Sequence, residues 1–325
     1  MTKLKILLTG GAGYIGSCTA NILLDHGCEV FIIDDLSTGH KKLVPKKSNF
    51  YQCSIQSNKV SKILEENNFD VVMHFAAFIQ VEESTKYPRK YIKNNYENTV
   101  KFLKKCKKYN LKNIIISSTA AVYGNSSKKK TFNEISKLNP SNPYAKSKLK
   151  IEKYIKKNKY FNFIILRYFN VAGADLKLRS GQISKKSTHL IKKLCQSSLN
   201  NKPLPIFGSD YLTKDGTAIR DYIHVIDLAN IHYLAAKYLL KKNKSQIFNC
   251  GYGYGFTVKE VVDTFNKISK NKINYIYRDR RAGDVGVLIS NSNKIKKILK
   301  WKSKYESLKE ILKSHLQWEK KINNE

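Results

Sequence analysis

Residues 9–16 read TGGAGYIG and directly follow the apolar run KILL at residues 5–8. Gly10, Gly13 and Gly16 are spaced three apart, and a helical pattern begins straight after them. A pyrophosphate can sit at such a helix start, where free N–H groups and the helix dipole favour negative charge. Glycines also let the backbone approach the phosphates closely. The stretch predicts a dinucleotide-binding turn, although its spacing is GxxGxxG and not GxGxxG; a plain glycine turn is the alternative.

Around this turn, continuous apolar runs alternate with amphipathic helical stretches. The expected buried strands are Leu4–Leu8, Val30–Ile33, Val71–Phe75, Ile114–Ile116 and Phe163–Leu166. The expected helices lie near residues 15–26, 57–67, 89–109 and 143–157. Strands that are apolar throughout, separated by helices, predict an α/β fold with a doubly wound parallel sheet covered on both faces.

The pattern loosens beyond about residue 175, where turn residues multiply. They are Gly181, Pro203, Pro205, Gly208, Gly216, Gly251, Gly253 and Gly255. We therefore expect a dinucleotide-binding domain over residues 1–175 and a smaller α/β substrate-binding region over residues 176–325. The stretch from Ser303 to Ile322 is expected to be a terminal amphipathic helix.

The formal net charge of +35 raises the possibility of nucleic-acid binding. However, only seven of the 60 basic residues are arginine, and the lysines are spread along the whole chain. No basic tract is interleaved with aromatic residues that could stack bases. We expect no specific nucleic-acid partner, while anionic substrates would be favoured.

The sequence also bears on location and on metals. No run of about 18 apolar residues indicates a membrane span, and the first residues lack the features of a signal peptide. The six cysteines lie far apart, without a CxxC pair, which argues against disulfides or zinc and favours the cytoplasm. His74, His189, His224 and His232 are scattered, and we interpret them as packing or polar lining without a metal.

Asp34 and Asp35 follow the second expected strand, where a ribose-binding carboxylate belongs. An acid there binds a free 2′-hydroxyl and repels a 2′-phosphate, so NAD is favoured over NADP. Two acids in a solvated loop are the alternative interpretation.

Residues 144–148 read YAKSK, after Asn142 and Pro143, which suit the start of a helix. Tyr144 and Lys148 then share one helix face, about 6 Å apart along the axis. An ammonium beside a tyrosine lowers the tyrosine pKa, and a positive nicotinamide ring would lower it further. The pair predicts a general base for a hydroxyl proton beside a hydride acceptor.

A third polar group is expected at the same place. The strand NIIISS ends in Ser117, Ser118 and Thr119, and hydroxyls at the carboxyl edge of a parallel sheet point into its ligand crevice. Thr119, Tyr144 and Lys148 are thus predicted to surround one cofactor. A core tyrosine is the alternative for Tyr144 taken alone.

Six motifs together carry a family resemblance: TGGAGYIG, SSTAAVYG, PYAKSK, LRYFNVAGA, GTAIRDYIHV and RRAGD. In this order they resemble the UDP-glucose 4-epimerases, a branch of the extended short-chain dehydrogenases/reductases, from residue 5 to about 318. The resemblance implies reversible 4-epimerisation of UDP-glucose and UDP-galactose with tightly bound NAD, through a 4-keto intermediate. It implies that Tyr144 takes the proton of the sugar 4-hydroxyl, Lys148 tunes Tyr144 and binds the nicotinamide ribose, and Thr119 bonds the reacting hydroxyl.

The same resemblance implies two sets of contacts. The cofactor set is Gly10, Gly13, Tyr14, Ile15, Gly16, Asp34, Asp35, Leu36, Ser54, Ile55, Phe75, Ala76, Ala77, Asn95, Ser117, Tyr144, Lys148 and Tyr168. The substrate set is Thr119, Asn170, His189, Leu190, Phe207, Arg220, Tyr222, Arg281, Asp284 and Leu288. Among so few arginines, Arg220 and Arg281 suit a bidentate clamp on a diphosphate. Surface ion pairs with Asp221 and Asp284 are the alternative.

The chain departs from the family pattern at three points. Ser54 stands where the family usually has an aspartate that bonds the adenine amine, so cofactor affinity is expected to be lower. Ile79 replaces a lysine that some relatives place near the nicotinamide. Leu288 matches a position whose size decides whether an N-acetylated sugar fits, and leucine leaves that question open.

Several rival functions follow from the same scaffold. Nucleotide-sugar dehydratases follow the threonine with an acid, but here Ala120 and Ala121 follow Thr119, which disfavours dehydration and, less strongly, decarboxylation. A UDP-N-acetylglucosamine 4-epimerase, with this activity alone or as a second one, stays open. A non-catalytic NAD-binding or polyanion-binding protein would not need Tyr144 and Lys148.

The resemblance also bears on assembly. Homodimers are usual in the family, through helices matching residues 89–109 and 143–157, although these helices are rich in lysine here. The stretch near residues 222–250 is expected to return to the first domain.

Overall fold

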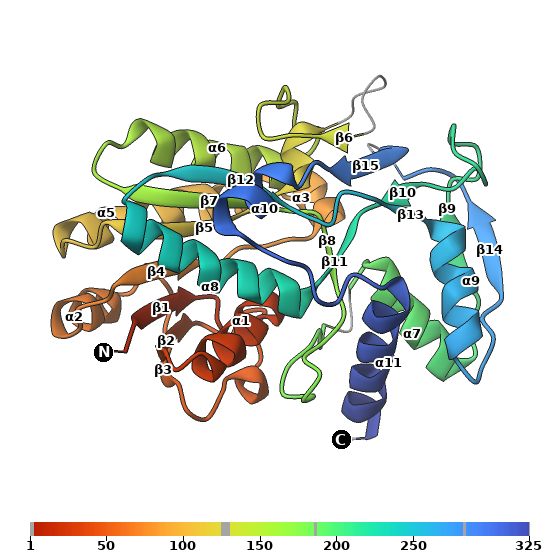
Figure 1. Cartoon of the computed structure of the whole chain (residues 1–325), viewed down its shortest axis with the longest axis horizontal. Coiled ribbons are helices and arrows are strands. Elements are labelled where there is room, and N and C mark those ends of the chain that lie inside the picture. The colour runs from red at the N-terminus through yellow and green to blue at the C-terminus, as the bar shows by residue number, and fades with distance from the viewer. Residues whose placement is uncertain (1–2, 125–130, 185–186, 282–283, 325) are drawn as a thin grey trace.

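The computed structural model describes residues 3–124, 131–184, 187–281 and 284–324 (Figure 1). Its centre is a seven-stranded sheet in the order β12-β7-β5-β4-β1-β2-β3, in which every neighbouring pair is parallel. The strands are β1 (Lys5–Thr9), β2 (Glu29–Asp34), β3 (Asn49–Gln52), β4 (Val71–His74), β5 (Asn113–Thr119), β7 (Asn162–Tyr168) and β12 (Gln246–Cys250). The predicted doubly wound parallel α/β fold is confirmed, as are the five predicted strands. Strands β3 and β12 were not predicted.

Helices cover both faces of this sheet. They are α1 (Tyr14–Asp25), α2 (Asn58–Glu66), α5 (Asn98–Lys108), α6 (Pro143–Lys157) and α8 (Val225–Lys242). Helices α1 and α8 pack on one face, while α2, α5 and α6 pack on the other (Figure 1). Successive strand residues point to opposite faces. Ile6 and Leu8 therefore join the core beneath α1 and α8, while Leu7 joins the core beneath α2, α5 and α6.

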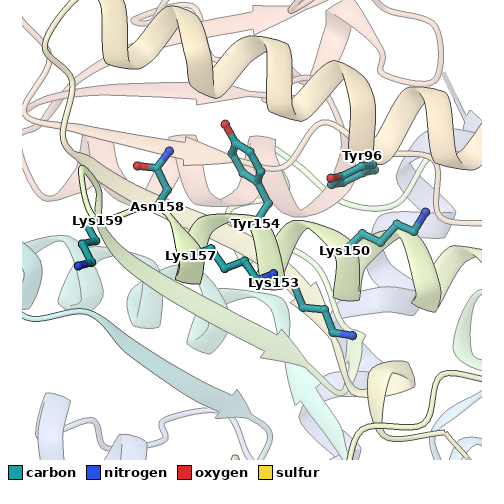
Figure 2. Close-up of a pocket in the computed structure, with 7 residues that line it drawn as sticks. All are labelled: Tyr96, Lys150, Lys153, Tyr154, Lys157, Asn158 and Lys159. Carbon is teal, nitrogen blue, oxygen red and sulfur yellow. The ribbon is translucent and has the colours of Figure 1, made fainter.

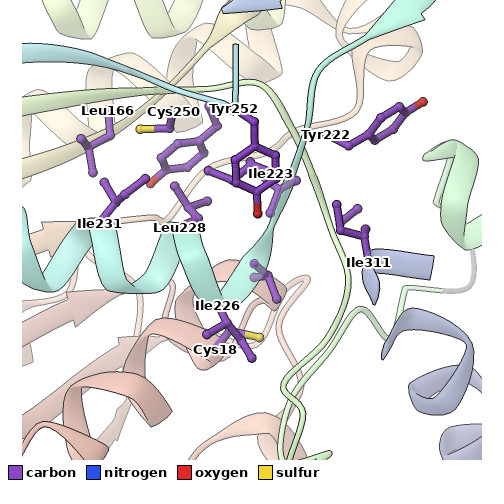
Figure 3. Close-up of a cluster of buried hydrophobic side chains, with 14 of the residues drawn as sticks. Cys18, Leu166, Tyr222, Ile223, Ile226, Leu228, Ile231, Cys250, Tyr252 and Ile311 are labelled. Atoms are coloured by element: carbon purple, nitrogen blue, oxygen red, sulfur yellow. The ribbon is translucent and has the colours of Figure 1, made fainter. Parts of the chain in front are cut away.

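Helix α8 and strand β12 come from the second half of the chain but belong to this large sheet. Figure 3 shows Leu228 and Ile231 of α8 packed toward Leu166 of β7 and Cys250 of β12, all four of them buried. The burial of these apolar side chains holds residues 225–250 against the strands built from residues 1–168.

The predicted helix near residues 89–109 is divided into three parts. Helix α4 (Pro88–Tyr91) leads into a π-helical turn, η2 (Ile92–Glu97), and then into α5. Such turns are rare and occur often at functional sites. Asn95 lies within this turn and is fully buried.

Smaller sheets fill the other end of the molecule. One has the order β13-β10-β15-β6, and two pairs join β11 to β8 and β14 to β9. The strands are β6 (Thr131–Phe132), β8 (Asn170–Ala172), β9 (Leu204–Phe207), β10 (Ile219–Arg220), β11 (Tyr222–His224), β13 (Phe256–Thr257), β14 (Tyr275–Arg278) and β15 (Val287–Ser290). The remaining helical elements are η1 (Lys41–Leu43), α3 (Val81–Lys86), η3 (Ala120–Tyr123), α7 (Leu190–Asn200), α9 (Val258–Ile268), α10 (Asn293–Leu299) and α11 (Leu308–Asn324).

The terminal helix begins later than predicted, at Leu308 and not at Ser303. The backbone N–H groups of Lys304 and Tyr305 donate to the buried carboxylate of Asp227, at 3.0 and 2.9 Å to Oδ2. These bonds tie the segment before α11 to α8. Within the described ranges, no helix is long and apolar enough to cross a lipid bilayer.

A buried ion pair joins α6 to β7. The Arg167 guanidinium donates two bonds to Glu152, with Nε 3.0 Å from Oε1 and Nη2 2.6 Å from Oε2, and both side chains are about 1% exposed. The Ser118 hydroxyl donates to the same carboxylate at 2.5 Å. Both charged groups are shielded from water, so each depends on its partner to compensate for its lost hydration.

Arg167→Met is expected to lower the free energy of unfolding by about 3–5 kcal/mol, because it leaves the Glu152 carboxylate buried and unpaired. Adding Glu152→Gln removes that charge and restores part of the loss. Urea unfolding at equal NAD content measures both. Lys62→Met, which removes an exposed pair with Glu66 on α2, is the control and changes the free energy by no more than about 0.5 kcal/mol. A double variant no more stable than Arg167→Met would contradict this assignment.

Candidate active site

The site lies at one edge of the large sheet. Strands β1, β4, β5 and β7 run parallel and end at Thr9, His74, Thr119 and Tyr168. The carboxyl ends of parallel strands meet at a single edge, which is where ligands bind in open α/β sheets. Residues far apart in the sequence are therefore brought together here.

The glycine turn between β1 and α1 is closely packed against the chain. Gly10 has a φ of +74°, and a Cβ there would come within 2.5 Å of the backbone nitrogen of Ala76. A Cβ on Gly16 would lie 2.3 Å from the carbonyl oxygen of Gly10. Gly13, which begins α1 without a side-chain cap, has more room, since its Cβ would meet only that same oxygen, at 3.3 Å. Gly10 and Gly16 thus serve the packing of the turn, whereas Gly13 leaves a helix start open to an anion.

Asp34 ties the end of β2 to the glycine turn. Its carboxylate accepts the backbone N–H of Ala12 and that of Leu36, each at 2.9 Å. Burial raises its pKa, and these two bonds act in the opposite direction. Each carboxylate oxygen has a second lone pair, so Asp34 can still accept a ribose hydroxyl. Asp35 is exposed and accepts the N–H of Ser37 at 3.0 Å.

Asn95 shapes the loop after β4, which contains Phe75, Ala76 and Ala77. Its amide accepts from the N–H of Phe78 at 2.8 Å and donates to the carbonyl of Phe78 at 2.9 Å. It also donates to the Ser147 hydroxyl of α6 at 3.1 Å. The whole polar end of Asn95 is therefore bonded to the protein, and it clamps this loop to α6.

Helix α6 brings Tyr144 and Lys148 to the edge. Asn142 caps it by accepting the N–H of Ala145 at 2.9 Å, and Pro143 occupies the first turn, as predicted. The Lys148 ammonium is 3% exposed and donates to the carbonyl and the hydroxyl of Ser117, at 2.9 and 3.1 Å. Burial lowers the pKa of Lys148 to about 8, and the negative charge of Glu152, one turn further along α6, opposes this.

The predicted lowering of the Tyr144 pKa is wrong for the protein on its own. Burial raises the pKa of Tyr144 to about 12, and a hydrogen bond with Thr119 opposes the rise. The Lys148 ammonium is directed at Ser117 and does not offset that burial. The structure does bring Thr119 and Tyr144 together, as the sequence predicted.

The expected sugar-nucleotide residues gather on the small sheets. Arg220 lies across β10 and β15 from Leu288, and Tyr222 lies across β11 and β8 from Asn170. Leu288 packs against the cluster of Ala120, Val122, Tyr123, Phe132, Leu149 and Phe169, of which the first three belong to the segment directly after Thr119. This packing places the strand of Leu288 next to the segment that follows Thr119.

The two expected phosphate ligands are held differently. Arg220 donates to Asp284 at 2.5 Å, whereas Asp221 is buried and accepts from the hydroxyl of Ser290. The alternative expectation, ion pairs of the arginines with Asp221 and Asp284, is thus correct for Asp284, which pairs with Arg220, and wrong for Asp221. Arg281 lies over the ring of Phe207, with 3.9 Å from its guanidinium carbon to the centroid. Besides this cation–π contact, Arg281 forms an ion pair with Glu82, with 4.0 Å between Nε and Oε1.

The other expected contact residues lie at the ends of elements. His189 precedes α7 at the N-cap position, without a side-chain capping bond, and Leu190 is the first residue of the helix. Ser54 and Ile55 follow β3, and the Ser54 hydroxyl accepts the N–H of Gln56 at 3.3 Å. Ile79 lies in the loop after β4 and is 55% exposed. The part of the chain that the structure describes holds no group of three or more His, Cys, Asp or Glu side chains that could bind a metal ion.

A surface hollow of about 620 Å³ lies away from this edge, between η2 and α6. Its lining is Tyr96, Lys150, Lys153, Tyr154, Lys157, Asn158 and Lys159. In Figure 2, Lys150, Lys153 and Lys157 all project from α6. This basic surface includes none of the expected site residues.

The sequence pattern of the NAD dependent epimerase/dehydratase family matches residues 6–251. The chain belongs to this family. Among curated relatives, the UDP-glucose 4-epimerase of Lactobacillus helveticus is 40% identical over 322 residues, which cover 98% of this chain and 97% of that protein. The predicted resemblance is thereby confirmed.

Solved structures of family members match the whole fold. The UDP-glucose 4-epimerase of Stenotrophomonas maltophila, with bound NAD and formylated UDP-arabinopyranose, is 28% identical, with a TM-score of 0.94 and 99% of each chain covered. The UDP-Glc/GlcNAc 4-epimerase of Campylobacter jejuni is 42% identical, with a TM-score of 0.85, covering 98% of this chain and 99% of that one.

The residues present fit the NAD of this family. The open helix start at Gly13 suits a pyrophosphate, and the carboxylate of Asp34 suits an unphosphorylated ribose. The Lys148 ammonium and the Thr119 hydroxyl reach the same edge of the sheet. When bound, NAD supplies an acceptor for hydride.

Sequence reasoning missed the buried pair of Glu152 and Arg167, which joins α6 to β7 one helical turn from Lys148. A signal was present, because Arg167 interrupts the apolar run FIILRYF and Glu152 lies among apolar positions of α6. A charge at a buried position of an element requires a partner. The partner itself could be found only from the three-dimensional structure.

Gly13→Ala and Gly16→Ala form a matched pair for the cofactor turn. Gly13→Ala adds a methyl group to the open helix start, so we expect an NAD Kd raised roughly tenfold to a hundredfold, in line with an overpacking cost of about 1–3 kcal/mol. The thermal stability of its NAD-free form should be unchanged. Gly16→Ala places a methyl group against the Gly10 carbonyl and should lower the Tm of the NAD-free protein. Equal loss of Tm in both variants would contradict the separate roles.

Proposed function

We propose that this protein interconverts UDP-glucose and UDP-galactose by inverting carbon 4 of the sugar, with NAD retained in the site. The observation that supports this most directly is the convergence of Thr119, Tyr144 and Lys148 at the sheet edge, beside the glycine turn. The relatives and solved structures named above are 4-epimerases of UDP-sugars, which is in line with this proposal.

Tyr144 is proposed as the general base. It takes the proton of the sugar 4-hydroxyl while carbon 4 gives up its hydride, so that a C=O bond forms at that carbon. Thr119 holds the reacting hydroxyl, and Lys148 binds the nicotinamide ribose and supplies a positive charge. Because burial alone raises the pKa of Tyr144 to about 12, the phenolate form depends on positive charge brought close to it. The 4-keto sugar then turns in the pocket and takes the hydride back on its other face.

Arg220 and Arg281 are proposed as the diphosphate ligands. Arg220 is ion-paired with Asp284, and Arg281 is oriented by the ring of Phe207. A guanidinium can bind phosphate oxygens through two parallel N–H groups. Asn170, His189, Leu190 and Tyr222 are proposed to border the uridine and the sugar.

We further propose a division of labour along the chain. Residues 1–175, together with the stretch 222–250 that includes α8 and β12, bind NAD. The remainder of residues 176–325 binds the UDP-sugar. The membership of β12 in the large sheet supports the assignment of that stretch.

The plain sugar is favoured over its N-acetylated counterpart by the relatives matched over nearly the whole chain, which are UDP-glucose 4-epimerases. Leu288 packs beside Phe169 and Leu149 and sets the depth of the pocket in this proposal. An assay of UDP-galactose and UDP-N-acetylgalactosamine in parallel separates the two specificities.

We also infer a cytoplasmic homodimer. All six cysteines have free thiols, as in a reducing compartment. The proposed dimer face is formed by α5 and α6, and α6 carries Lys150, Lys153 and Lys157 beside the hollow of Figure 2. Two copies meeting there would bring like charges together, so association depends on screening by salt.

Tyr144→Phe is expected to lower kcat for UDP-galactose by about 10²–10⁴-fold, the usual contribution of a general acid–base group. The ring stays in place, so NAD content and Tm should match the parent protein. Turnover is measured with purified protein and UDP-galactose, with and without added NAD. Full activity of the variant, or no turnover by the parent protein with NAD present, would contradict the proposed function.

Dimerisation is expected to strengthen as salt increases. Sedimentation equilibrium at 50 mM and 500 mM NaCl should show a lower dissociation constant at the higher concentration. Lys153→Gln with Lys157→Gln should favour the dimer at low salt, whereas Lys62→Gln on α2 should leave it unchanged. A monomer at both salt concentrations would remove the dimer from the account.

A further inference from the structure

His232 is a buried histidine that the proposed mechanism does not use. It lies on α8, in the second half of the chain, and is fully buried. Its ring contacts the ring of Phe75, with centroids 4.9 Å apart, and its Nε2 is 2.7 Å from the hydroxyl of Tyr168. Phe75 and Tyr168 are both expected cofactor contacts, so His232 lies directly behind the cofactor side of the edge.

The hydrogen-bond partners define the state of this ring. Nδ1 is 2.8 Å from the carbonyl oxygen of Leu228, which can only accept. Nδ1 must therefore carry the proton. Burial also lowers the pKa of His232 to about 4, so the ring is neutral near pH 7 and its Nε2 has no proton. It follows that the Tyr168 hydroxyl donates to Nε2.

The direction of the next bonds follows from this one. Tyr168 gives its only proton to His232, so its oxygen can only accept in its hydrogen bond with Ser117. The Ser117 hydroxyl then donates to Tyr168, and its oxygen is left to accept from the Lys148 ammonium, at 3.1 Å. All four side chains are at least nine-tenths buried, so water does not compete for these hydrogen bonds or reverse their donor–acceptor directions.

Lys148 is thereby held at a fixed orientation. It has three N–H donors; two are used by the hydroxyl and the carbonyl of Ser117. The third is left for the cofactor ribose. In this direction of the chain the Ser117 oxygen accepts from Lys148, which stabilises the charged ammonium. In the reverse direction the Ser117 hydroxyl would donate to Lys148, which requires a neutral amine.

We propose that His232 is a positioning residue for catalysis: as the final acceptor of the one-way chain Lys148–Ser117–Tyr168–His232, it orients Lys148 toward the cofactor and keeps it charged. This inference rests on the proposed function for the role of Lys148. In this proposal α8 does more than pack apolar side chains on the large sheet, because it also brings His232 to Tyr168.

Removing the acceptor should reverse the chain. Without Nε2, the Tyr168 hydroxyl turns to donate to Ser117, and the Ser117 hydroxyl turns toward Lys148. The titratable groups facing Lys148 are Glu152 on α6, His74 at the end of β4, Tyr144 one turn earlier on α6, and Tyr168. Of these groups only Tyr168, a member of the chain, changes its hydrogen bond in a His232 variant, so a shift in the Lys148 titration reports the chain.

The test is the pH profile of kcat/KM for UDP-galactose in four proteins: the parent, His232→Phe, His232→Gln and Tyr168→Phe. His232→Phe keeps a flat ring beside Phe75 but has no acceptor. We expect the alkaline limb of its pH profile to move about one pH unit lower, since the loss of a hydrogen bond to a charged group changes the pKa of that group by about one unit or slightly more. His232→Gln, whose amide oxygen accepts, should recover at least half of this shift.

Two comparisons separate positioning from structure. His224→Gln alters another fully buried histidine, at the start of α8, and should lower Tm without moving the pH profile. Combining His232→Phe with Tyr168→Phe should shift the limb no further than Tyr168→Phe alone, because both break one chain. A His232→Phe profile that superimposes on the parent after scaling, with a loss of Tm like that of His224→Gln, would overturn the proposal.

NAD affinity provides a readout that does not need turnover. The Kd of NAD measured from pH 6 to pH 10 should rise through the pKa of Lys148, and this rise should begin about one unit earlier in His232→Phe. If UDP-galactose is not converted but this shift is found, the chain stands and the proposed function fails. If UDP-galactose is converted and neither the Kd nor the rate profile shifts, the chain fails and the proposed function stands.

Discussion

The burial of a single ammonium group, that of Lys148, is the constraint on which the site depends. An isolated charge in the interior is costly unless hydrogen bonds compensate for it. Here the end of β5 supplies the carbonyl and the hydroxyl of Ser117, and Glu152 supplies a negative charge one helical turn away. Glu152 is in turn held by Arg167 of β7. The neighbouring strands β5 and β7 thus both support the groups around Lys148.

The second half of the chain completes this arrangement. Helix α8 packs its apolar side chains on the sheet through Leu228 and Ile231 (Figure 3), and the same helix brings His232 to Tyr168. Strand β12 extends the sheet beyond β7. On the other side of the edge, the strand that carries Leu288 packs next to the segment after Thr119. The proposed cofactor side and the proposed sugar side are consequently both built from early and late residues.

The first half of the fold could be predicted because its signals are local. The glycine turn, the five apolar strands and the helix start at Asn142 each lie within a short stretch of sequence. Strand β3 was missed because it is only partly buried, and the two-residue strands around Arg220 carry too few residues for a periodic signal. The π-helical turn at Asn95 and the pair of Glu152 with Arg167 depend on partners distant in sequence. The pKa of Tyr144 was predicted in the wrong direction because burial, which raises it, is a property of the folded chain.

The central claim is that the hydrogen on carbon 4 leaves the sugar, is held within the site beside Tyr144 and Lys148, and returns to the same carbon. The most direct measurement follows UDP-galactose deuterated at carbon 4 through conversion in ordinary water, with mass spectrometry of the UDP-glucose formed. The account predicts that the product keeps its deuterium at carbon 4 and gains no hydrogen from solvent. Loss of the deuterium to water would show that carbon 4 is deprotonated, and would contradict a mechanism of hydride transfer.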